Sequence, residues 1–210
     1  LHKRGYRKLQ SKAPISETLA AALIMLTPWK KDRILVDPFC GSGTFPIEAA
    51  MMAADIAPGL NRSFLAEQWT HLVPKKCWMD AAEDARYRIR NDIETDIQGF
   101  DIDGDVIKSA RENAKLAGVE KRCHFEVADV ADFAAKQEAI VLTNPPYGER
   151  MSTIEGAAKL ARTLGRQMEA HPCAGVYAIT ADMDFETHYG KRANKRRKMY
   201  NGMIPCQLYM

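Results

Sequence analysis

A glycine turn between an apolar run and a helical pattern, RILVDPFCGSGTFPIE at residues 33–48, constrains the fold most. The run ends in Asp37-Pro38, and Gly41-Ser42-Gly43 precedes an alanine-rich pattern that predicts a helix over residues 44–56. Glycine serves where a backbone bends sharply or approaches a ligand closely. A parallel α/β sheet binds ligands at the carboxyl ends of its strands. We therefore expect a Rossmann-like α/β fold with a ligand over this turn.

Two nucleotide-binding motifs do not fit this turn. A dinucleotide fingerprint carries a third glycine where this chain has Pro46, and the Gly-Lys-Ser/Thr of a P-loop is missing. Asp37, four positions before Gly41, would repel a phosphate and attract an ammonium group. S-adenosylmethionine carries an amino acid moiety and a sulfonium, so the turn favours this cofactor and a methyltransferase. An ordinary strand–turn–helix packed through its glycines is the alternative.

Carboxylates follow three successive predicted strands. Asp37, Asp101 and Asp129 each come directly after an apolar or alternating segment, or within two residues of its end. Such ends line one crevice in a parallel sheet, where Asp101 could accept two ribose hydroxyls and Asp129 the adenine amino group. Asp103 competes with Asp101 for the ribose. Each acid alone could be a loop or N-cap aspartate, but three at successive strand ends favour a cofactor site.

The segment Asn144-Pro145-Pro146-Tyr147 follows the fourth predicted strand at once. Consecutive prolines stiffen the backbone and leave neighbouring carbonyls free to accept hydrogen bonds. The Asn144 side-chain oxygen and the Pro145 carbonyl could accept the two hydrogens of an exocyclic base amine, and Tyr147 could stack on the base. A rigid turn is the alternative interpretation. The position after this strand favours catalysis by positioning of the amine for in-line methyl transfer.

Composition is that of one globular α/β domain. The chain has 210 residues, 46% hydrophobic and 27% charged, which is enough for a full core. It has no apolar run of membrane-span length and no signal peptide. Its five cysteines form no CxxC pair, which predicts a reduced cytoplasmic protein without a metal site. Cys40 is expected to be a small buried residue and not a reactive thiol.

Basic residues gather near both ends of the chain. Residues 1–12 hold five of them and residues 191–198 hold six, with no acid in either segment. The other 19 basic residues share the body with all 27 acidic ones. Basic ends on an acidic body suggest local contact with a polyanion, although solvated tails would look the same. The chain opens on Leu1 in a polar segment and resembles a piece of a longer protein.

The remaining segments predict the other elements of such a fold. A helix is expected over residues 15–26 with Ser16 as N-cap, another over 105–117 closed by Gly118, and one opened by a capping box at Ser152. A long insertion spans about 57–95 and contains a helical pattern at 75–93. Strands are expected at 33–36, 97–100, 122–127, 139–142 and 175–180, with a closing hairpin of 198–200 and 204–209.

These motifs resemble the class I amino methyltransferases. The whole set, LHKRGYR, DPFCGSGTFPIEAA, DIAPGLNR, GFDID, NPPYGERM and KRRKMYNG, is similar to the RlmL-type, THUMP-associated 23S rRNA guanine-N2 methyltransferases of Gram-positive bacteria. The resemblance implies a seven-stranded, mostly parallel sheet with a C-terminal antiparallel hairpin. It also implies S-adenosylmethionine as cofactor and a guanine N2 of 23S rRNA as substrate. Residues 1–14 would be a basic linker from a THUMP-like domain, and residues 15–210 the methyltransferase domain.

The resemblance assigns roles residue by residue. Catalysis falls to Asn144, Pro145, Pro146 and Tyr147. The predicted cofactor-binding residues are Thr18, Asp37, Pro38, Cys40, Gly41, Gly43, Thr44, Asp101, Ile102, Asp129, Val130 and Asn144. The predicted RNA-binding residues are Arg4, Arg7, Arg150, Lys195, Arg196 and Arg197.

Three alternatives stay open at this point. Adenine-N6 DNA methyltransferases share the NPPY motif, but this chain shows no target-recognition domain, and its basic ends suit structured RNA. A related group acts on tRNA guanine. A non-catalytic RNA-binding module would not need the acids, the glycines and NPPY together, and it would fail to bind S-adenosylmethionine.

Overall fold

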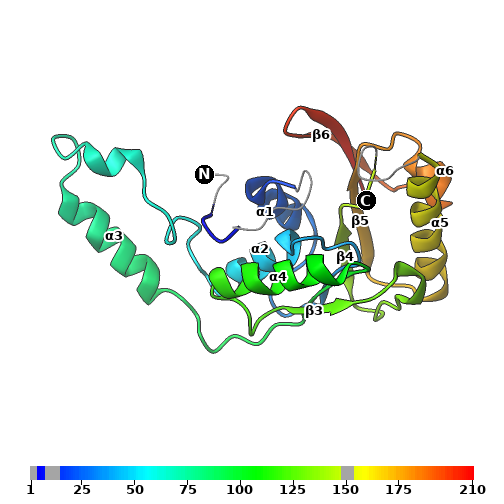
Figure 1. Ribbon diagram of the computed structural model, residues 1–210, viewed down its shortest axis with the longest axis horizontal. Coiled ribbons are helices and arrows are strands. Elements are labelled where there is room, and N and C mark those ends of the chain that lie inside the picture. Colours follow the sequence, from blue (N-terminus) through cyan, green and yellow to red (C-terminus); the bar gives the residue numbers. More distant parts are fainter. Residues whose placement is uncertain (1–3, 8–14, 148–153) are drawn as a thin grey trace.

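A seven-stranded sheet of order β3-β2-β1-β4-β5-β7-β6 organises the molecule (Figure 1). The computed structural model describes residues 4–7, 15–147 and 154–210. Five strands are parallel: β1 (Leu35–Asp37), β2 (Ile97–Asp101), β3 (His124–Val127), β4 (Ile140–Thr143) and β5 (Gly175–Thr180). The last two, β6 (Arg196–Asn201) and β7 (Ile204–Tyr209), form an antiparallel hairpin on β5. The predicted fold class is confirmed.

Helices cover both faces of the sheet. The helices α1 (Glu17–Leu26), α2 (Thr44–Ala53) and α4 (Gly104–Leu116) share a core with Leu35 and Leu142 on one face. On the other face, α5 (Ile154–Ala170) and the turn η2 (Val130–Asp132) pack on Val36 and Val141, with α6 (Phe185–Tyr189) beside α5. No helix in the described part of the chain is long and apolar enough to cross a membrane.

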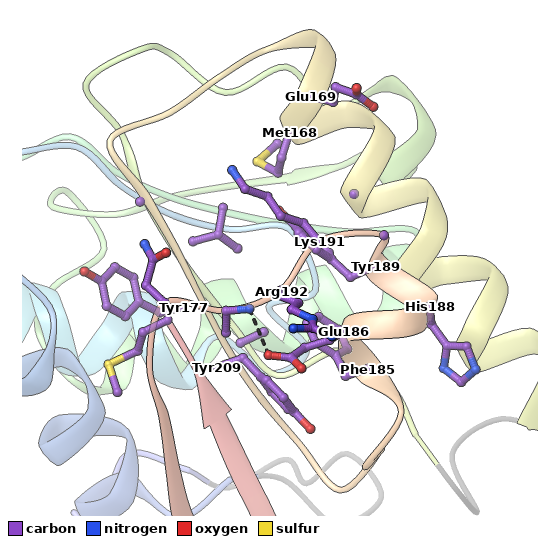
Figure 2. Close-up of a pocket in the computed structure, with 18 of the residues that line it drawn as sticks. Met168, Glu169, Tyr177, Phe185, Glu186, His188, Tyr189, Lys191, Arg192 and Tyr209 are labelled. Atoms are coloured by element: carbon purple, nitrogen blue, oxygen red, sulfur yellow. Dashed lines mark hydrogen bonds between the residues drawn. The ribbon is translucent and has the colours of Figure 1, made fainter.

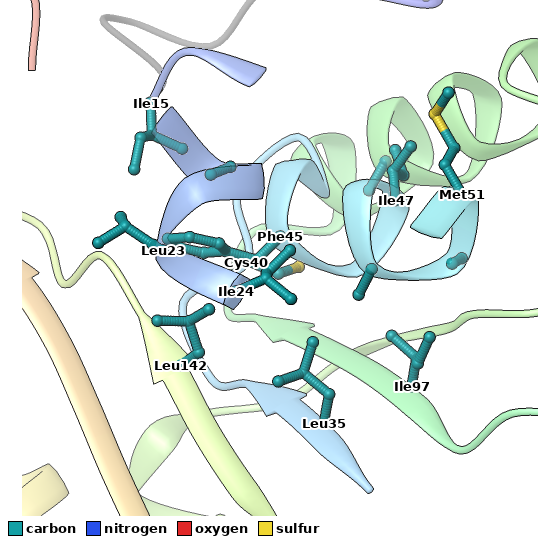
Figure 3. Close-up of a cluster of buried hydrophobic side chains, with 14 of the residues drawn as sticks. Ile15, Leu23, Ile24, Leu35, Cys40, Phe45, Ile47, Met51, Ile97 and Leu142 are labelled. Carbon is teal, nitrogen blue, oxygen red and sulfur yellow. The ribbon is translucent and has the colours of Figure 1, made fainter. Parts of the chain in front are cut away.

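Burial on both faces explains why the strand segments read as continuous apolar runs. Successive strand residues point to opposite faces, so Leu35 and Val36 join different cores although they are neighbours. Figure 3 shows Leu35 and Leu142 pointing from the sheet toward Leu23 and Phe45 of the helices above. This two-sided burial is typical of parallel sheets.

The position of β1 decides where a ligand can bind. β1 pairs with β2 on one side and with β4 on the other, so the order of strands reverses between β1 and β4. Ligands of open α/β sheets bind at such a reversal, beyond the carboxyl ends of the strands. The glycine turn after β1 and the Asn144 segment after β4 therefore lie at one edge.

The insertion at 57–95 forms an arm that leaves the body of the domain (Figure 1). It contains η1 (Leu65–Gln68) and α3 (Lys75–Tyr87), and α3 buries none of its residues. Phe64 and Trp78 stack at 5.9 Å, and the Arg62 guanidinium lies 4.8 Å from the Phe64 ring centroid. The arm is therefore held together by its own contacts. Its helix ends at Tyr87, short of the predicted 93, and beyond it the Arg90 amide donates to the Ala54 carbonyl at 2.9 Å and not to a helical carbonyl.

Other differences from the sequence predictions are local. Most element ends shift by one to three residues, Ser16 makes no side-chain capping hydrogen bond, and α6 was not predicted. The capping box at Ser152 lies outside the described residues. Residues 4–7, expected in a linker, pack into the domain: Tyr6 is fully buried, and a Cβ on Gly5 would lie 2.4 Å from the Asn61 carbonyl oxygen.

Candidate active site

The glycine turn is tied to the end of β2 by two hydrogen bonds. The Cys40 amide donates to the Phe100 carbonyl at 2.8 Å, and the Gly41 amide donates to Asp101 Oδ2 at 3.0 Å. Gly41 and Gly43 have φ values of +53° and +84°, which non-glycine residues rarely adopt. A Cβ on Gly43 would also lie 2.9 Å from the Phe125 ring. Backbone conformation and packing therefore both require this glycine.

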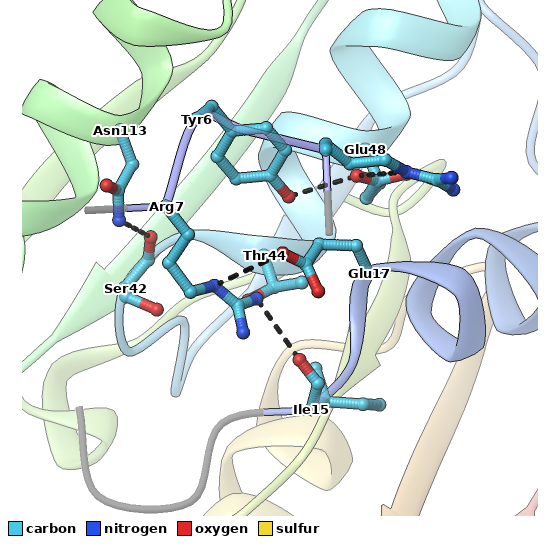
Figure 4. Close-up of polar contacts among 9 residues, drawn as sticks. Tyr6, Arg7, Ile15, Glu17, Ser42, Thr44, Glu48 and Asn113 are labelled. Carbon is cyan, nitrogen blue, oxygen red and sulfur yellow. Dashed lines mark hydrogen bonds and ion pairs between the residues drawn. The ribbon is translucent and has the colours of Figure 1, made fainter. Parts of the chain in front are cut away.

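Asn113 supports the same turn from α4. Its side chain is fully buried, and Nδ2 donates to the Ser42 carbonyl at 3.2 Å (Figure 4). Buried polar side chains are retained where they satisfy backbone groups that have no other partner. The sequence analysis missed Asn113, because an asparagine on a polar helix gives no signal that it faces the core.

Asp37 is a buried carboxylate at the end of β1. Its Oδ1 accepts hydrogen bonds from Thr143 Oγ1 at 2.6 Å and from the Phe39 amide at 3.1 Å. Burial raises the pKa of Asp37 to about 7, against the lowering effect of these two bonds. Among the described residues, Asp37 forms no ion pair. A buried carboxyl without a cation suits the ammonium group of an amino acid ligand.

Asp101 differs from both Asp103 and Asp129, because each of those two carboxylates caps a helix. Asp129 Oδ1 accepts from the Ala131 amide at 2.9 Å at the start of η2. Asp103 caps α4, its side chain accepting from the Asp105 and Val106 amides. Asp101 instead accepts from the Gly41 amide of the glycine turn, and burial raises its pKa. The Ala128 amide donates to the Asp101 carbonyl at 3.0 Å, which brings Asp129 next to it. The geometry thus separates Asp101, beside the glycine turn, from the helix cap at Asp103.

Apolar side chains accompany these acids. Ile102 follows Asp101 and is 70% exposed, while Val130 follows Asp129 and is buried. An exposed isoleucine beside the Asp101 carboxylate offers an apolar surface that could cover a flat ring. Pro38 and Cys40 are buried under the turn. Burial raises the pKa of the Cys40 thiol well above its ordinary value, so Cys40 is not an activated nucleophile.

The Asn144 segment begins where β4 ends. Thr143 pairs with Ala178 of β5, and Asn144 and Pro145 are buried directly beyond it. The Tyr147 ring was expected to be open for stacking, but it is only 9% exposed and joins the main core. Its hydroxyl lies 3.8 Å from Cys206 Sγ of β7. In this structure Tyr147 therefore anchors the segment to the C-terminal hairpin.

Arg4 and Arg7 do not lie on the surface where RNA binding was expected. Arg4 Nη2 pairs with Glu48 Oε2 at 3.3 Å, and both side chains are buried. Arg7 donates to Thr44 Oγ1 at 2.6 Å and to the Ile15 carbonyl at 3.1 Å (Figure 4). Its Nε lies 3.8 Å from Glu17 Oε1. These arginines join the segments before α1 to the start of α2, because buried charges need a partner.

The other predicted residues divide between the site and the surface. Thr18 lies half-buried in the first turn of α1, and Thr44 begins α2 directly after the glycine turn. Lys195, Arg196 and Arg197 are exposed on or beside the edge strand β6, where Arg196 pairs with Glu186 at 3.6 Å. The last three residues of the basic C-terminal segment, 196–198, therefore lie in a strand and not in a tail. Arg150 lies outside the described residues.

A cavity of about 820 Å³ lies elsewhere, between α5, α6 and β5. Figure 2 shows Phe185, Tyr189 and Tyr209 gathered in it. The Phe185 ring stacks on Tyr189 and is tilted against Tyr209, with ring centroids 5.5 and 5.1 Å apart. None of the residues predicted for the active site lines it. Among the described residues, no three His, Cys, Asp or Glu side chains are grouped to hold a metal ion.

Comparison with known proteins identifies the family. The family described as "RMKL-like, methyltransferase domain" matches residues 4–210. The chain belongs to this family. YpsC of Bacillus subtilis is 42% identical over 210 residues, all of this chain and 54% of YpsC. The Aliivibrio fischeri protein "Ribosomal RNA large subunit methyltransferase K/L" is 38% identical over 98% of this chain and 30% of its own length. This RMKL-like chain thus spans about half or less of these relatives.

Two solved structures are similar over 99% of this RMKL-like chain. SMU.472, solved in complex with SAH, is 40% identical with a TM-score of 0.91, and 54% of it is covered. A Listeria monocytogenes protein titled "predicted N6-adenine-specific DNA methylase" is 44% identical with a TM-score of 0.90, again with 54% covered. The resemblance predicted from the sequence is confirmed at the level of the family.

Proposed function

We propose that this chain is the catalytic domain of an S-adenosylmethionine-dependent methyltransferase that acts on a guanine N2 amine in 23S rRNA. One observation carries the proposal. The Thr143–Asp37 hydrogen bond puts the Asn144 segment beside the carboxylate and the glycine turn that suit the cofactor. The ribosomal RNA methyltransferase name of a 38% identical relative supports RNA as the substrate class.

The site fits S-adenosylmethionine at each of its parts. Asp37 pairs with no cation among the described residues, and it would hold the ammonium group. Asp101, fixed by the Gly41 amide, would accept the ribose hydroxyls, and Asp129 the adenine amino group. Ile102 would cover the adenine ring. When bound, the cofactor supplies an electrophilic methyl group on a sulfonium. SAH, its demethylated product, is present in the structure of SMU.472.

The Asn144 segment would position the acceptor amine. Asn144 Oδ1 and the Pro145 carbonyl would each accept one amine hydrogen, which aims the nitrogen lone pair at the methyl carbon. Both residues are buried, and preorganised acceptors act strongly in a site that excludes water. The N–CH₃ bond would form as the S–CH₃ bond breaks, and the methylated nitrogen would then lose one proton to the surrounding solvent as the product leaves. Positioning supplies most of the rate, so no strong base is needed.

Adenine-N6 methylation of DNA is the second candidate, because the Listeria monocytogenes relative carries that title. NPPY suits any exocyclic base amine and does not choose the base. The exposed basic residues of β6 suit phosphates of either nucleic acid. RNA is favoured by the rRNA methyltransferase relative.

One experiment tests the proposal against these alternatives. The purified protein receives methyl-labelled S-adenosylmethionine with rRNA, tRNA or DNA from cells that lack it. Digestion to nucleosides and mass spectrometry then identify the product. We expect N2-methylguanosine in large-subunit rRNA. N6-methyladenine in DNA, or N2-methylguanosine only in tRNA, would replace the proposal with the corresponding alternative. Asn144→Ala protein is the control for contaminating activity.

A further inference from the structure

The hairpin of β6 and β7 extends past the edge of the sheet that holds the candidate site. β5 ends at Thr180, which pairs with Gln207, and Gln207 pairs with Lys198 of β6. Three further residue pairs continue toward the turn and end at Asn201–Ile204. At about 3.3 Å per residue the hairpin extends roughly 10 Å beyond the carboxyl end of β5. Figure 1 shows it rising from the body next to β5.

Three large apolar side chains gather at the end of this hairpin. Tyr200 is 69% exposed, Met203 93% and Ile204 41%, and we call these three residues the hairpin tip. A two-residue turn, Gly202-Met203, with Gly202 at φ +64°, closes it tightly. Edge strands are normally protected by charges, and exposed apolar clusters mark interaction sites. We therefore infer that the hairpin tip binds a partner.

One residue of the hairpin tip, Ile204, lies on the face of the hairpin that contacts Tyr147. Side chains two residues apart on a strand share a face, so Ile204 lies on the same face as Cys206. Cys206 Sγ is 3.8 Å from the Tyr147 hydroxyl. Ile204 is thus one step closer to the turn than the contact that anchors Tyr147. Tyr200 lies on the opposite face, which it shares with Lys198 and Arg196.

The strand that leads to the hairpin tip is strongly basic. Arg196, Arg197 and Lys198 are exposed along β6, and no acidic residue follows Glu186 in the sequence. Among the described residues Arg197 and Lys198 form no ion pair, while Arg196 pairs with Glu186. Cations followed by exposed aromatic and apolar side chains are the combination that binds single-stranded RNA, through phosphates and base stacking.

We propose that the hairpin tip stacks on the RNA nucleotides that flank the target base, while Arg197 and Lys198 contact their phosphates. The inference rests on the proposed function and extends it to the recognition of the strand around the base. A base that leaves its stack for the active site unstacks its neighbours. The hairpin tip, which lies beyond the end of β5 in the hairpin that anchors Tyr147, supplies a replacement surface. It acts in positioning the RNA and touches neither the methyl group nor the amine.

The test compares two exposed tyrosines. Tyr200→Ala removes the stacking ring, Tyr200→Phe keeps it, and Tyr87→Ala is the matched control, because Tyr87 is 90% exposed on the remote helix α3. Filter binding to deproteinised large-subunit rRNA gives the RNA Kd, and calorimetry gives the SAH Kd. We expect Tyr200→Ala to weaken RNA binding roughly tenfold, as loss of one stacked base predicts. Tyr200→Phe and Tyr87→Ala should stay within about twofold, and SAH affinity should not change.

Several outcomes would overturn the inference. Equal RNA affinity of the Tyr200→Ala and Tyr87→Ala proteins would overturn the inference about the hairpin tip. If the wild-type protein still methylates rRNA, the proposed function would hold without that inference. A Tyr200→Ala protein that changes only its oligomeric state would assign the hairpin tip to a protein interface. If wild-type protein methylates DNA and not RNA, the proposed function fails, whereas the RNA-binding comparison of Tyr200 with Tyr87 still decides the inference.

Discussion

Thr143 Oγ1 donates a 2.6 Å hydrogen bond to Asp37 Oδ1, which joins two residues 106 positions apart in the chain. The bond links the end of β4 to the end of β1 at the reversal of strand order. Asn144 follows Thr143 directly, so one buried contact sets the spacing between Asp37, the carboxylate proposed to hold the cofactor, and the segment proposed to hold the base amine.

We expect Thr143→Val to weaken both the fold and the site. The change keeps the side-chain shape but removes the donor to a buried carboxyl, which costs about 1.5–3 kcal/mol for a hydrogen bond to a charged group. Urea unfolding would measure the loss, and calorimetry with SAH would show weaker binding. Thr143→Ser keeps the hydroxyl and should retain most of both. A valine variant with wild-type stability and SAH affinity would show that this bond does not organise the site.

Asp37→Asn should make the cofactor-free protein more stable at high pH. The folded-state pKa of about 7 exceeds the unfolded value of 3.8, so the folded protein binds more protons between these values. The contribution of Asp37 to stability is therefore most favourable below about pH 4, and it is lost as the pH rises to 7. Asparagine removes this penalty, on the order of 2–4 kcal/mol at pH 8. Urea unfolding should show that Asp37→Asn raises the free energy of unfolding at both pH 5 and pH 8, and that the increase is smaller at pH 5.

The same substitution should impair cofactor binding. Wild-type affinity for S-adenosylmethionine is expected to decline as pH falls below about 7, because protonated Asp37 no longer attracts the ammonium group. Calorimetry across pH 6–8 measures this dependence. Asp37→Asn protein should bind weakly, and the pH dependence due to this group should be gone. A wild-type profile that is flat over this range would contradict the assignment of Asp37 to the ammonium.

Asn144→Ala should separate chemistry from cofactor binding. Loss of one preorganised acceptor costs roughly 2–4 kcal/mol of transition-state stabilisation, so turnover should fall about 30-fold or more. SAH affinity should remain close to that of the wild type, since Asp37, Gly41 and Asp101 are unchanged. Single-turnover methylation and calorimetry measure the two quantities. Equal losses in both would mean that Asn144 serves the cofactor and not the base.

The basic residues should fall into two groups with different phenotypes. Replacing Lys195, Arg196 and Arg197 by alanine is expected to reduce the slope of log K against log salt for RNA binding, by about 0.7 per lost phosphate contact on a single strand.

Arg4→Met leaves Glu48 buried without its cation, so it should destabilise the fold by about 3–5 kcal/mol. At a temperature where the Arg4→Met protein stays folded, the salt dependence of its RNA binding should equal that of the wild type. If the slope of log K against log salt changed in the Arg4→Met protein, Arg4 would contact RNA after all.

The strand–turn–helix around Asp37 and the order of the elements could be predicted because their signals are local. Apolar runs, glycines and prolines restrict the backbone within a few residues of themselves. The three strand-end acids were predicted in the same way, since parallel strands end at one edge whatever their side chains contact. The closing hairpin was predicted from its own segments at 198–200 and 204–209, and the resemblance of the motifs to a known family implied that the seven strands form one mostly parallel sheet.

Tertiary structure alone decided which distant groups meet. No local pattern pairs Arg4 with Glu48, brings Arg7 to Thr44, covers Tyr147 with β7 or turns Asn113 inward. Periodicity states which face of an element is buried and not what it is buried against. The charge of Arg4 predicted a surface role, whereas its desolvation in the folded chain requires a partner. Likewise, the overhang of the hairpin tip follows from the register of β5, β7 and β6, which the sequence of any one strand does not contain.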